Sequence, residues 1–401
     1  MNFEGFLDFF EIKNWNFSDF ESLKNILKHR NIKLQVSIFA ATNFDKDGLK
    51  SIFQFLKIQK IKLDQKIDCD GVMESIEKSR KILENPLIMK NVLEDLGCFD
   101  IERLRKVSKS VRNCIEIVKP DPKIRKIALK IEDSNFIRMD ICSKFQENLS
   151  IFYQKNLDGY SVNRASFNGP CDLSKIFLTD FTQILKNQRV PIELLDIQGG
   201  SNDQFMDLIL KNCSPKFFGQ FQVQNLILQR LSDYQVFQIL KFIDSKFLET
   251  ITIMDALKSF SLDDYSKLDQ WKMAKQLVIE GFSITTPIQN LEIFNFSNLD
   301  IKVPNLSIED VIHLKTKFSE SQTVMKLKIN FERFTNPENI ENFLRRPYSQ
   351  KSHNSIWFIR IPNSQKCLHL NYVISRSFIF SRFDVSSIPE DAFPNRLGYQ
   401  I

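Results

Sequence analysis

The sequence predicts an α/β protein with an all-α insert. A strand, a helix and a second strand follow one another in residues 32–63, and the same order recurs in residues 223–253. Between these segments, residues 85–115 contain three short pieces with helical apolar spacing and no strand pattern. The chain is therefore expected to combine a strand and helix array with a small helical domain.

The strand and helix units are recognised by their periodicity. In the first unit, apolar residues alternate from Ile32 to Ile38 and then recur at helical spacing from Leu49 to Leu56. Strands in both units begin on the order of 25–30 residues apart, the spacing at which leucine-rich-type repeats stack into a curved sheet. Further candidate units extend the array over residues 124–335, which predicts an irregular leucine-rich-repeat-like solenoid.

The two ends of the chain differ from this array. Residues 1–75 contain the first unit, which looks like a partial copy of the downstream region, and a polar linker follows it. Residues 355–384 alternate as three strands, with a Pro-Asn-Ser turn after the first. These three strands are expected to close the sheet.

Composition indicates a folded protein of a reducing compartment. Hydrophobic residues make up 43% of the 401 residues, enough for more than one core. The seven cysteines are widely scattered and form no C-x-x-C pair. The N-terminus lacks the pattern of a signal peptide, and no apolar run approaches the roughly 18 residues of a membrane span. The sequence therefore predicts a cytoplasmic or nuclear protein without a membrane segment.

Residues 85–118 are expected to form three short helices. Pro86 suits the first turn of the first helix, and Gly97 suits its end. Asp100 is expected to cap the second helix and Ser108 the third. Their apolar positions follow helical spacing, with Ile88, Val92, Leu93 and Leu96 in the first, Ile101, Leu104 and Val107 in the second, and Val111, Ile115 and Val118 in the third.

Three helices of two or three turns bury too little surface to be stable by themselves. Two interpretations remain open on spacing alone. The helices cover one end of the repeat array, or they form a composite core with another protein.

The helical stretch "NPLIMKNVLEDLGCFDIERLRKVSKSVRNCI" resembles an F-box. It has a proline followed by an apolar helix, an acidic start to "DIERLRKVSKS", and a final helix with R-x-x-I. The downstream segments "LSIEDVIHLKTKF", "VMKLKINFE" and "WFIRIPNSQKCLHLNYVISRSFIFSRFDVSSIP" resemble the FTH domain of the nematode F-box A family. The resemblance implies an F-box at residues 82–122 and an FTH-type repeat domain at 124–394.

The resemblance also implies a function. F-boxes bind the Skp adaptor of SCF-type (Skp, cullin, F-box) ubiquitin ligases, and through it the cullin and RING subunits, while the downstream domain recruits a target protein. This role needs no cofactor and no catalytic residue in the chain itself. Asn85 replaces a usual apolar residue and Val111 a frequent aromatic one. The implied adaptor-facing residues are Pro86, Leu87, Leu93, Leu96, Arg105, Val107, Val111 and Ile115.

A basic stretch from Arg103 to Lys130 stands out from the mixed charges elsewhere, in a chain of formal net charge +6. The resemblance offers one explanation, because Skp adaptors are acidic proteins. Complementary charge would speed the encounter between the basic stretch and such an adaptor. One alternative is a nucleic-acid-binding module, which the lack of aromatic residues among these cations makes unlikely. Another is a plain interaction scaffold, with the cations simply solvating helix faces.

The sequence shows no catalytic or metal-binding pattern. Its four histidines lie far apart, and the Cys367 and His369 pair is too small for a zinc site. Gly199 and Gly200 follow a strand, but no Walker-type Lys-Ser/Thr comes after them, so a turn between repeats is the favoured interpretation. We expect the chain not to be an enzyme.

Overall fold

The computed structural model describes residues 86–105, 109–133, 135–144, 149–163, 165–169, 172–200, 203–213, 221–256, 260–335, 340–389 and 392–393. The strand-helix-strand unit expected within residues 1–75 lies outside the described residues. The described part is a mixed α/β structure with fifteen strands. Two compact units comprise the described residues within Met1–Arg125, Ile141–Ile151 and Asn156–Val190, and within Lys126–Asp140, Phe152–Lys155 and Pro191–Ile401.

The described part of the first unit contains four helices and a hairpin. The helices are α5 (Pro86–Glu94), α6 (Cys98–Arg105), α7 (Lys109–Val118) and α8 (Leu173–Leu185). Strands β4 (Gly159–Val162) and β5 (Ala165–Asn168) pair antiparallel, and the ring centroids of Tyr160 and Phe167 lie 4.9 Å apart across the pair. The residues of strands β1 (Ile124–Asp133), β2 (Phe136–Ser143) and β3 (Leu149–Asn156) are divided between the two units.

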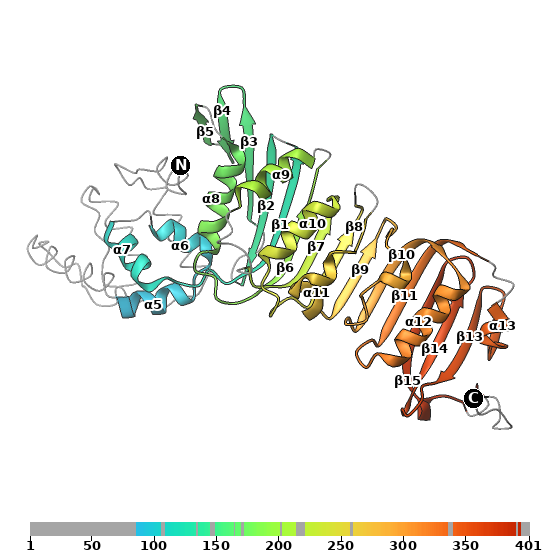
Figure 1. The fold of residues 1–401 in the computed structure, drawn as a ribbon. Coiled ribbons are helices and arrows are strands. Elements are labelled where there is room, and N and C mark those ends of the chain that lie inside the picture. Colours follow the sequence, from blue (N-terminus) through green and yellow to red (C-terminus); the bar gives the residue numbers. More distant parts are fainter. Residues whose placement is uncertain are drawn as a thin grey trace, which may run out of the picture. The chain divides into compact units, whose positions relative to one another are not determined.

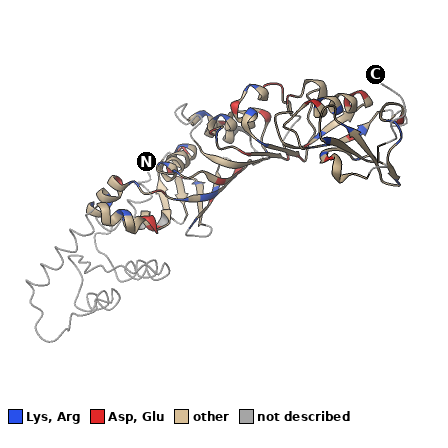
Figure 2. Ribbon diagram, turned by 90° about the horizontal axis from the view of Figure 1, so that it is seen from below, with Lys and Arg blue, Asp and Glu red and all other residues tan. Residues whose placement is uncertain are grey.

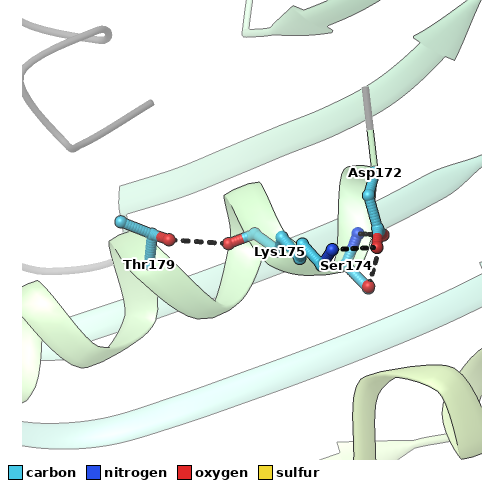
Figure 3. A network of polar contacts seen from close by, with 4 residues as sticks. All are labelled: Asp172, Ser174, Lys175 and Thr179. Atoms are coloured by element: carbon cyan, nitrogen blue, oxygen red, sulfur yellow. Dashed lines mark hydrogen bonds and ion pairs between the residues drawn. The ribbon is translucent and has the colours of Figure 1, made fainter. Parts of the chain in front are cut away.

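Helix α8 begins at a side-chain cap. The carboxylate of Asp172 accepts hydrogen bonds from the backbone N–H of Ser174, at 3.1 Å, and from its hydroxyl (Figure 3). One turn on, the hydroxyl of Thr179 donates to the carbonyl oxygen of Lys175 at 2.7 Å. Burial alone would raise the pKa of Asp172, but the Ser174 hydrogen bonds and Lys175 hold it below its ordinary value. Asp172 thus fixes the start of the helix.

The second unit is dominated by one sheet, with helices α9, α10, α11 and α12 along one face (Figure 1). Its strand order is β12-β13-β14-β15-β11-β10-β9-β8-β7-β6-β1-β2-β3. The parallel part and its helices comprise β6 (Ile192–Gln198), α9 (Asp203–Asn212), β7 (Val223–Gln229), α10 (Asp233–Phe242), β8 (Thr250–Met254), η2 (Tyr265–Lys267), α11 (Asp269–Met273), β9 (Gln276–Glu280), η3 (Ile288–Asn290), β10 (Asn298–Leu306), α12 (Ile308–Glu320) and β11 (Lys326–Phe334).

The unit expected at residues 223–253 is confirmed, since β7, α10 and β8 occupy it. Residues 124–168 depart from the expected alternation, because β1 to β5 follow one another with no described helix between them. Their connections are too short for a parallel crossover, which needs a dozen or more residues. The alternation of strands and helices begins only at α8 and β6.

The three strands expected in residues 355–384 are present, and the structure pairs them antiparallel at the C-terminal end of the sheet. It comprises α13 (Ile340–Leu344), β12 (Ser349–Lys351), β13 (Asn354–Arg360), β14 (Lys366–Val373), β15 (Ser377–Asp384) and η5 (Val385–Ser387). The last strand, β15, pairs with β11, so β12 lies at the outer edge. The three strands therefore extend the parallel sheet, and β12 ends it.

One row of buried side chains runs through the helix-facing side of the sheet in continuous register. Because strand side chains alternate between faces, each neighbour in this row packs against the next and against the helices. The row consists of Ile127, Leu195, Leu226, Ile251, Leu277, Leu299, Leu327, Phe380, Leu370 and Trp357.

Candidate partner-binding surfaces

Helices α5, α6 and α7 enclose a single apolar cluster. Short helices reach stability mainly by packing their apolar faces together, and here all three contribute. Val92 and Val118 pack against the cluster from its margin. Its buried members are Met89, Leu93, Leu96, Ile101, Leu104, Val111, Cys114 and Ile115.

The eight implied adaptor-facing residues do not share one environment. Four of them, Leu93, Leu96, Val111 and Ile115, lie inside the cluster at 5% exposure or less. Pro86 and Leu87 are exposed, Leu87 at 76%. Arg105 is partly exposed, and Val107 lies outside the described residues. The buried four therefore shape the helical trio, while Pro86 and Leu87 lie on its surface.

Other apolar side chains on these helices differ from the sequence expectation. Met89, and not Ile88, lies in the cluster, and Ile88 is 36% exposed. On α7, Ile117 is 67% exposed and is not among the expected apolar positions of that helix. The spacing of Met89, Val92, Leu93 and Leu96 at i, i+3, i+4 and i+7 was the signal for the true buried face.

The second helix begins earlier than the sequence predicts. Helix α6 begins at Cys98, so Asp100 lies in its first turn, buried, and does not precede it as a cap. A carboxylate there still interacts favourably with the positive end of the helix. Ser108, the expected cap of the third helix, lies outside the described residues.

Several cations of the basic stretch are engaged within the protein. Arg105 forms an ion pair with Glu116, and the Arg112 Nε donates to the Arg105 carbonyl oxygen at 3.2 Å. The ammonium of Lys123 donates to the Glu94 carbonyl oxygen, which joins the end of α5 to the start of β1. Figure 2 marks the basic and acidic residues along the chain. These contacts leave fewer cations free for phosphate groups than the sequence suggests.

The face of the parallel sheet opposite the helices is polar and partly exposed. Its central row runs in register through Asp196, Ile227, Thr252, Val278 and Asp300. The Gln229 side-chain amide donates to Asp196 at 2.9 Å, and Lys328 pairs with Asp300 at 2.8 Å. Burial raises the pKa of Asp196, while the Gln229 hydrogen bond opposes this shift. Such a face offers hydrogen-bonding groups between small apolar patches.

Gly199 and Gly200 occupy a tight strand end. The Gly199 N–H donates to the Gln229 carbonyl oxygen at 2.8 Å. A Cβ on Gly200 would lie 2.0 Å from the Glu132 carbonyl oxygen, which is a backbone clash. This close approach of neighbouring strands explains the glycine pair without a bound phosphate.

The described residues contain no cluster of His, Cys, Asp and Glu fit to hold a metal ion. Burial raises the pKa of the Cys213 thiol to about 11, which makes it a poor nucleophile. No helix in the described part of the chain is long and apolar enough to cross a bilayer. His29 lies outside the described residues.

Comparisons with known proteins identify the downstream region. The family model for the FTH domain matches residues 203–347, from the start of α9 to just beyond α13, so the chain carries an FTH domain. The chain is 22% identical over 305 residues to F-box A protein 224 of Caenorhabditis elegans, which covers 72% of this chain and 76% of the relative. No solved structure matches the chain.

Proposed function

We propose that this protein is a substrate-recognition adaptor of an SCF-type ubiquitin ligase. In this proposal, α5, α6 and α7 are an F-box, within residues 82–122, that docks a Skp-type adaptor. The FTH-type repeat domain, within residues 124–394, recruits the target protein. The observation that carries the proposal is the order of the two parts, a helical trio with exposed apolar residues followed by an FTH domain.

The trio has a surface suited to a protein partner. Leu87 and Ile88 project from α5 and Ile117 from α7, at 76%, 36% and 67% exposure. Burying a leucine side chain contributes about 1.5–3 kcal/mol, so covering Leu87 would be a substantial part of an interface. We assign the direct contact to Pro86 and Leu87. Leu93, Leu96, Val111 and Ile115 hold the trio in shape for that contact.

The chain itself would perform no chemistry in this role. The Skp-type adaptor links it to the cullin and RING subunits, and these bring a ubiquitin-loaded enzyme to the target. Holding a target lysine near that enzyme raises its effective concentration, and this proximity accounts for the acceleration. The proposed compartments are the cytoplasm and the nucleus, where such ligases act.

The polar side of the parallel sheet supports the second half of the proposal. Repeat sheets commonly bind partners along an open face, and here Thr252, Val278 and Asp300 lie side by side on adjacent strands. Short alternating polar and apolar groups suit a protein segment better than a small apolar ligand.

Co-purification with a Skp-type adaptor tests the proposal. We expect the wild-type chain to retain the adaptor and Leu87→Asp to lose it, because the substitution places a charge in the interface. Leu157→Asp is the matched control, since Leu157 is fully exposed in the loop after β3. Failure of the wild type to retain the adaptor would refute the ligase assignment, and equal recovery of all three proteins would refute the docking surface.

A further inference from the structure

The antiparallel strands β13, β14 and β15 carry an apolar patch on the face that the helices leave open. Successive side chains along each strand point to opposite faces of the sheet, so one residue of known direction gives the face of the others. Phe380 points to the helices, with its ring centroid 5.9 Å from that of Phe318 in α12. The Trp357 indole N–H donates to the Arg345 carbonyl oxygen, 3.0 Å away, just after α13. The open-face patch comprises the alternate residues Ile356, Phe358, His369, Asn371, Ile379 and Phe383.

The rings of the open-face patch form a continuous row. Phe358 and His369 are direct cross-strand partners with ring centroids 5.2 Å apart, and His369 and Phe383 lie 5.3 Å apart at 83°. Tyr348, before β12, packs edge-on against Phe358 at 5.4 Å. Phe383 is 44% exposed and Tyr348 42%. A surface row of aromatic rings supplies the large, rigid contact area that is typical of interface hot spots.

Two polar side chains within the patch each contain one buried atom without a hydrogen-bond partner. His369 Nδ1 and Asn371 Oδ1 are buried atoms without a partner, although both side chains are partly exposed. A buried polar atom without a partner destabilises the fold, so native proteins rarely retain one without a reason.

The strands around the patch are strongly basic. Between positions 345 and 389 the sequence has a single acid, Asp384, and it pairs with Lys366 at 2.8 Å. Arg382 is committed to backbone carbonyl oxygens, among them that of Val324 at 2.8 Å. The basic residues of this stretch are Arg345, Arg346, Lys351, Arg360, Lys366, Arg376 and Arg382.

From the apolar centre and the excess of cations around it, we infer that the open-face patch binds an acidic segment of a partner protein, with aliphatic or aromatic side chains flanked by Asp or Glu. The apolar side chains would pack against Phe358, Ile379 and Phe383. Their acidic neighbours would meet the cations that have no acidic partner among the described residues, chiefly Lys351 and Arg360. The Arg360 guanidinium lies 4.3 Å from the ring centroid of Phe393 and has no carboxylate beside it in that part of the chain. This deepens the proposed function, on which it rests for the idea that the partner is the recruited target.

A protein segment fits this surface better than single-stranded nucleic acid. Bases stack on open ring faces, whereas these rings are tilted against one another at 41° and 83°, and Phe358 and His369 are largely covered. Asn371 lies between Ile356 and Ile379 on the neighbouring strands. These two isoleucines would pack best against apolar side chains of a partner.

Fluorescence anisotropy with the full-length chain tests the inference. The probe is a labelled peptide that alternates Asp and Glu with Leu and Phe, and it is compared with the same peptide carrying Lys at the acidic positions. We expect only the acidic peptide to bind. Binding should weaken about tenfold or more in Phe383→Ser and in Arg360→Glu, because each removes one of the two recognition features.

Phe343→Ser is the matched control, because Phe343 is 50% exposed on α13, on the helix side of the strands. It should bind as the wild type does. Failure of the acidic peptide to bind, or equal affinity in all variants, would overturn the inference. Tight binding of a uridine 12-mer that Phe383→Ser abolishes would overturn it in favour of RNA. Loss of Skp co-purification with intact peptide binding would refute the ligase proposal and leave the patch assignment standing.

Discussion

The Tyr265 hydroxyl donates a hydrogen bond to the Asp233 carboxylate at 2.7 Å and lies 3.0 Å from the backbone carbonyl oxygen of the same residue. The bond joins η2 to the first turn of α10, so it links two successive strand-connecting segments. Tyr265 is 2% exposed, and its ring packs against Trp271 at 5.2 Å. The second carboxylate oxygen of Asp233 accepts from the Ser261 N–H at 3.3 Å.

Replacing Tyr265 by Phe should lower the free energy of unfolding by about 1–3 kcal/mol, because it leaves a half-buried carboxylate without its hydroxyl donor. Urea denaturation followed by tryptophan fluorescence measures the change, with Trp271 as the nearby reporter. Tyr234→Phe is the control, since Tyr234 is 59% exposed on the same helix. Equal losses in the two variants would show that the hydrogen bond contributes no stability.

The same pair predicts a dependence on pH. Burial raises the pKa of Asp233 above its ordinary value of 3.8, and the Tyr265 hydrogen bond partly opposes this. When a carboxyl group has a raised pKa in the folded state, its contribution to the free energy of unfolding is lost as the pH rises through that pKa. Tyr265→Phe removes the opposing effect, so its deficit in unfolding free energy should be larger at pH 7 than at pH 4. An identical deficit at both values would contradict this.

Two reciprocal hydrogen bonds cap the start of helix α12. Ser307 accepts from the Asp310 N–H at 3.2 Å, and the Asp310 carboxylate accepts from the Ser307 N–H at 2.9 Å. Ser307→Ala should cost about 1 kcal/mol, because it removes the hydroxyl that accepts from the Asp310 N–H, while the backbone N–H at position 307 is kept. Ser319→Ala in the same helix should change stability far less, since its hydroxyl bonds only the Lys315 carbonyl oxygen, at 2.8 Å. Thermal unfolding of the two variants measures the two losses of stability.

The helical trio should respond differently to its buried and exposed leucines. Leu93→Ala removes a side chain that is 1% exposed, and buried leucine truncations typically cost about 2–5 kcal/mol. Leu87→Ala should leave the trio intact. Hydrogen exchange measured over α5, α6 and α7 reports the difference directly. Unchanged protection in Leu93→Ala would mean that the cluster does not hold the three helices together.

Local patterns in the sequence were sufficient for many elements. The alternation in residues 223–253 identified β7, α10 and β8, and the C-terminal alternation identified β13, β14 and β15. The basic stretch was also visible, but not the internal contacts of Lys123 and Arg112. These contacts join residues far apart in sequence or on different helices, which no local pattern encodes.

The candidate surfaces were less predictable. The sequence resemblance named eight residues of the trio without separating the buried Leu93 from the exposed Leu87, because both are apolar and only six positions apart. The ring row of Phe358, His369 and Phe383 was not foreseen. Its members lie on three strands, and only the register of those strands brings them together.

The sequence by itself determined several of the strands and helices, among them β7, α10, β8 and the three C-terminal strands, since apolar periodicity of two or of 3.6 residues selects the element that can bury one face. Tertiary structure alone decided that β15 pairs with β11, that Met89 and not Ile88 enters the cluster, and that one open sheet face collects aromatic rings among cations. The physical reason is that strand pairing and face exposure depend on which distant segments meet, and each chain segment carries information only about its own periodicity.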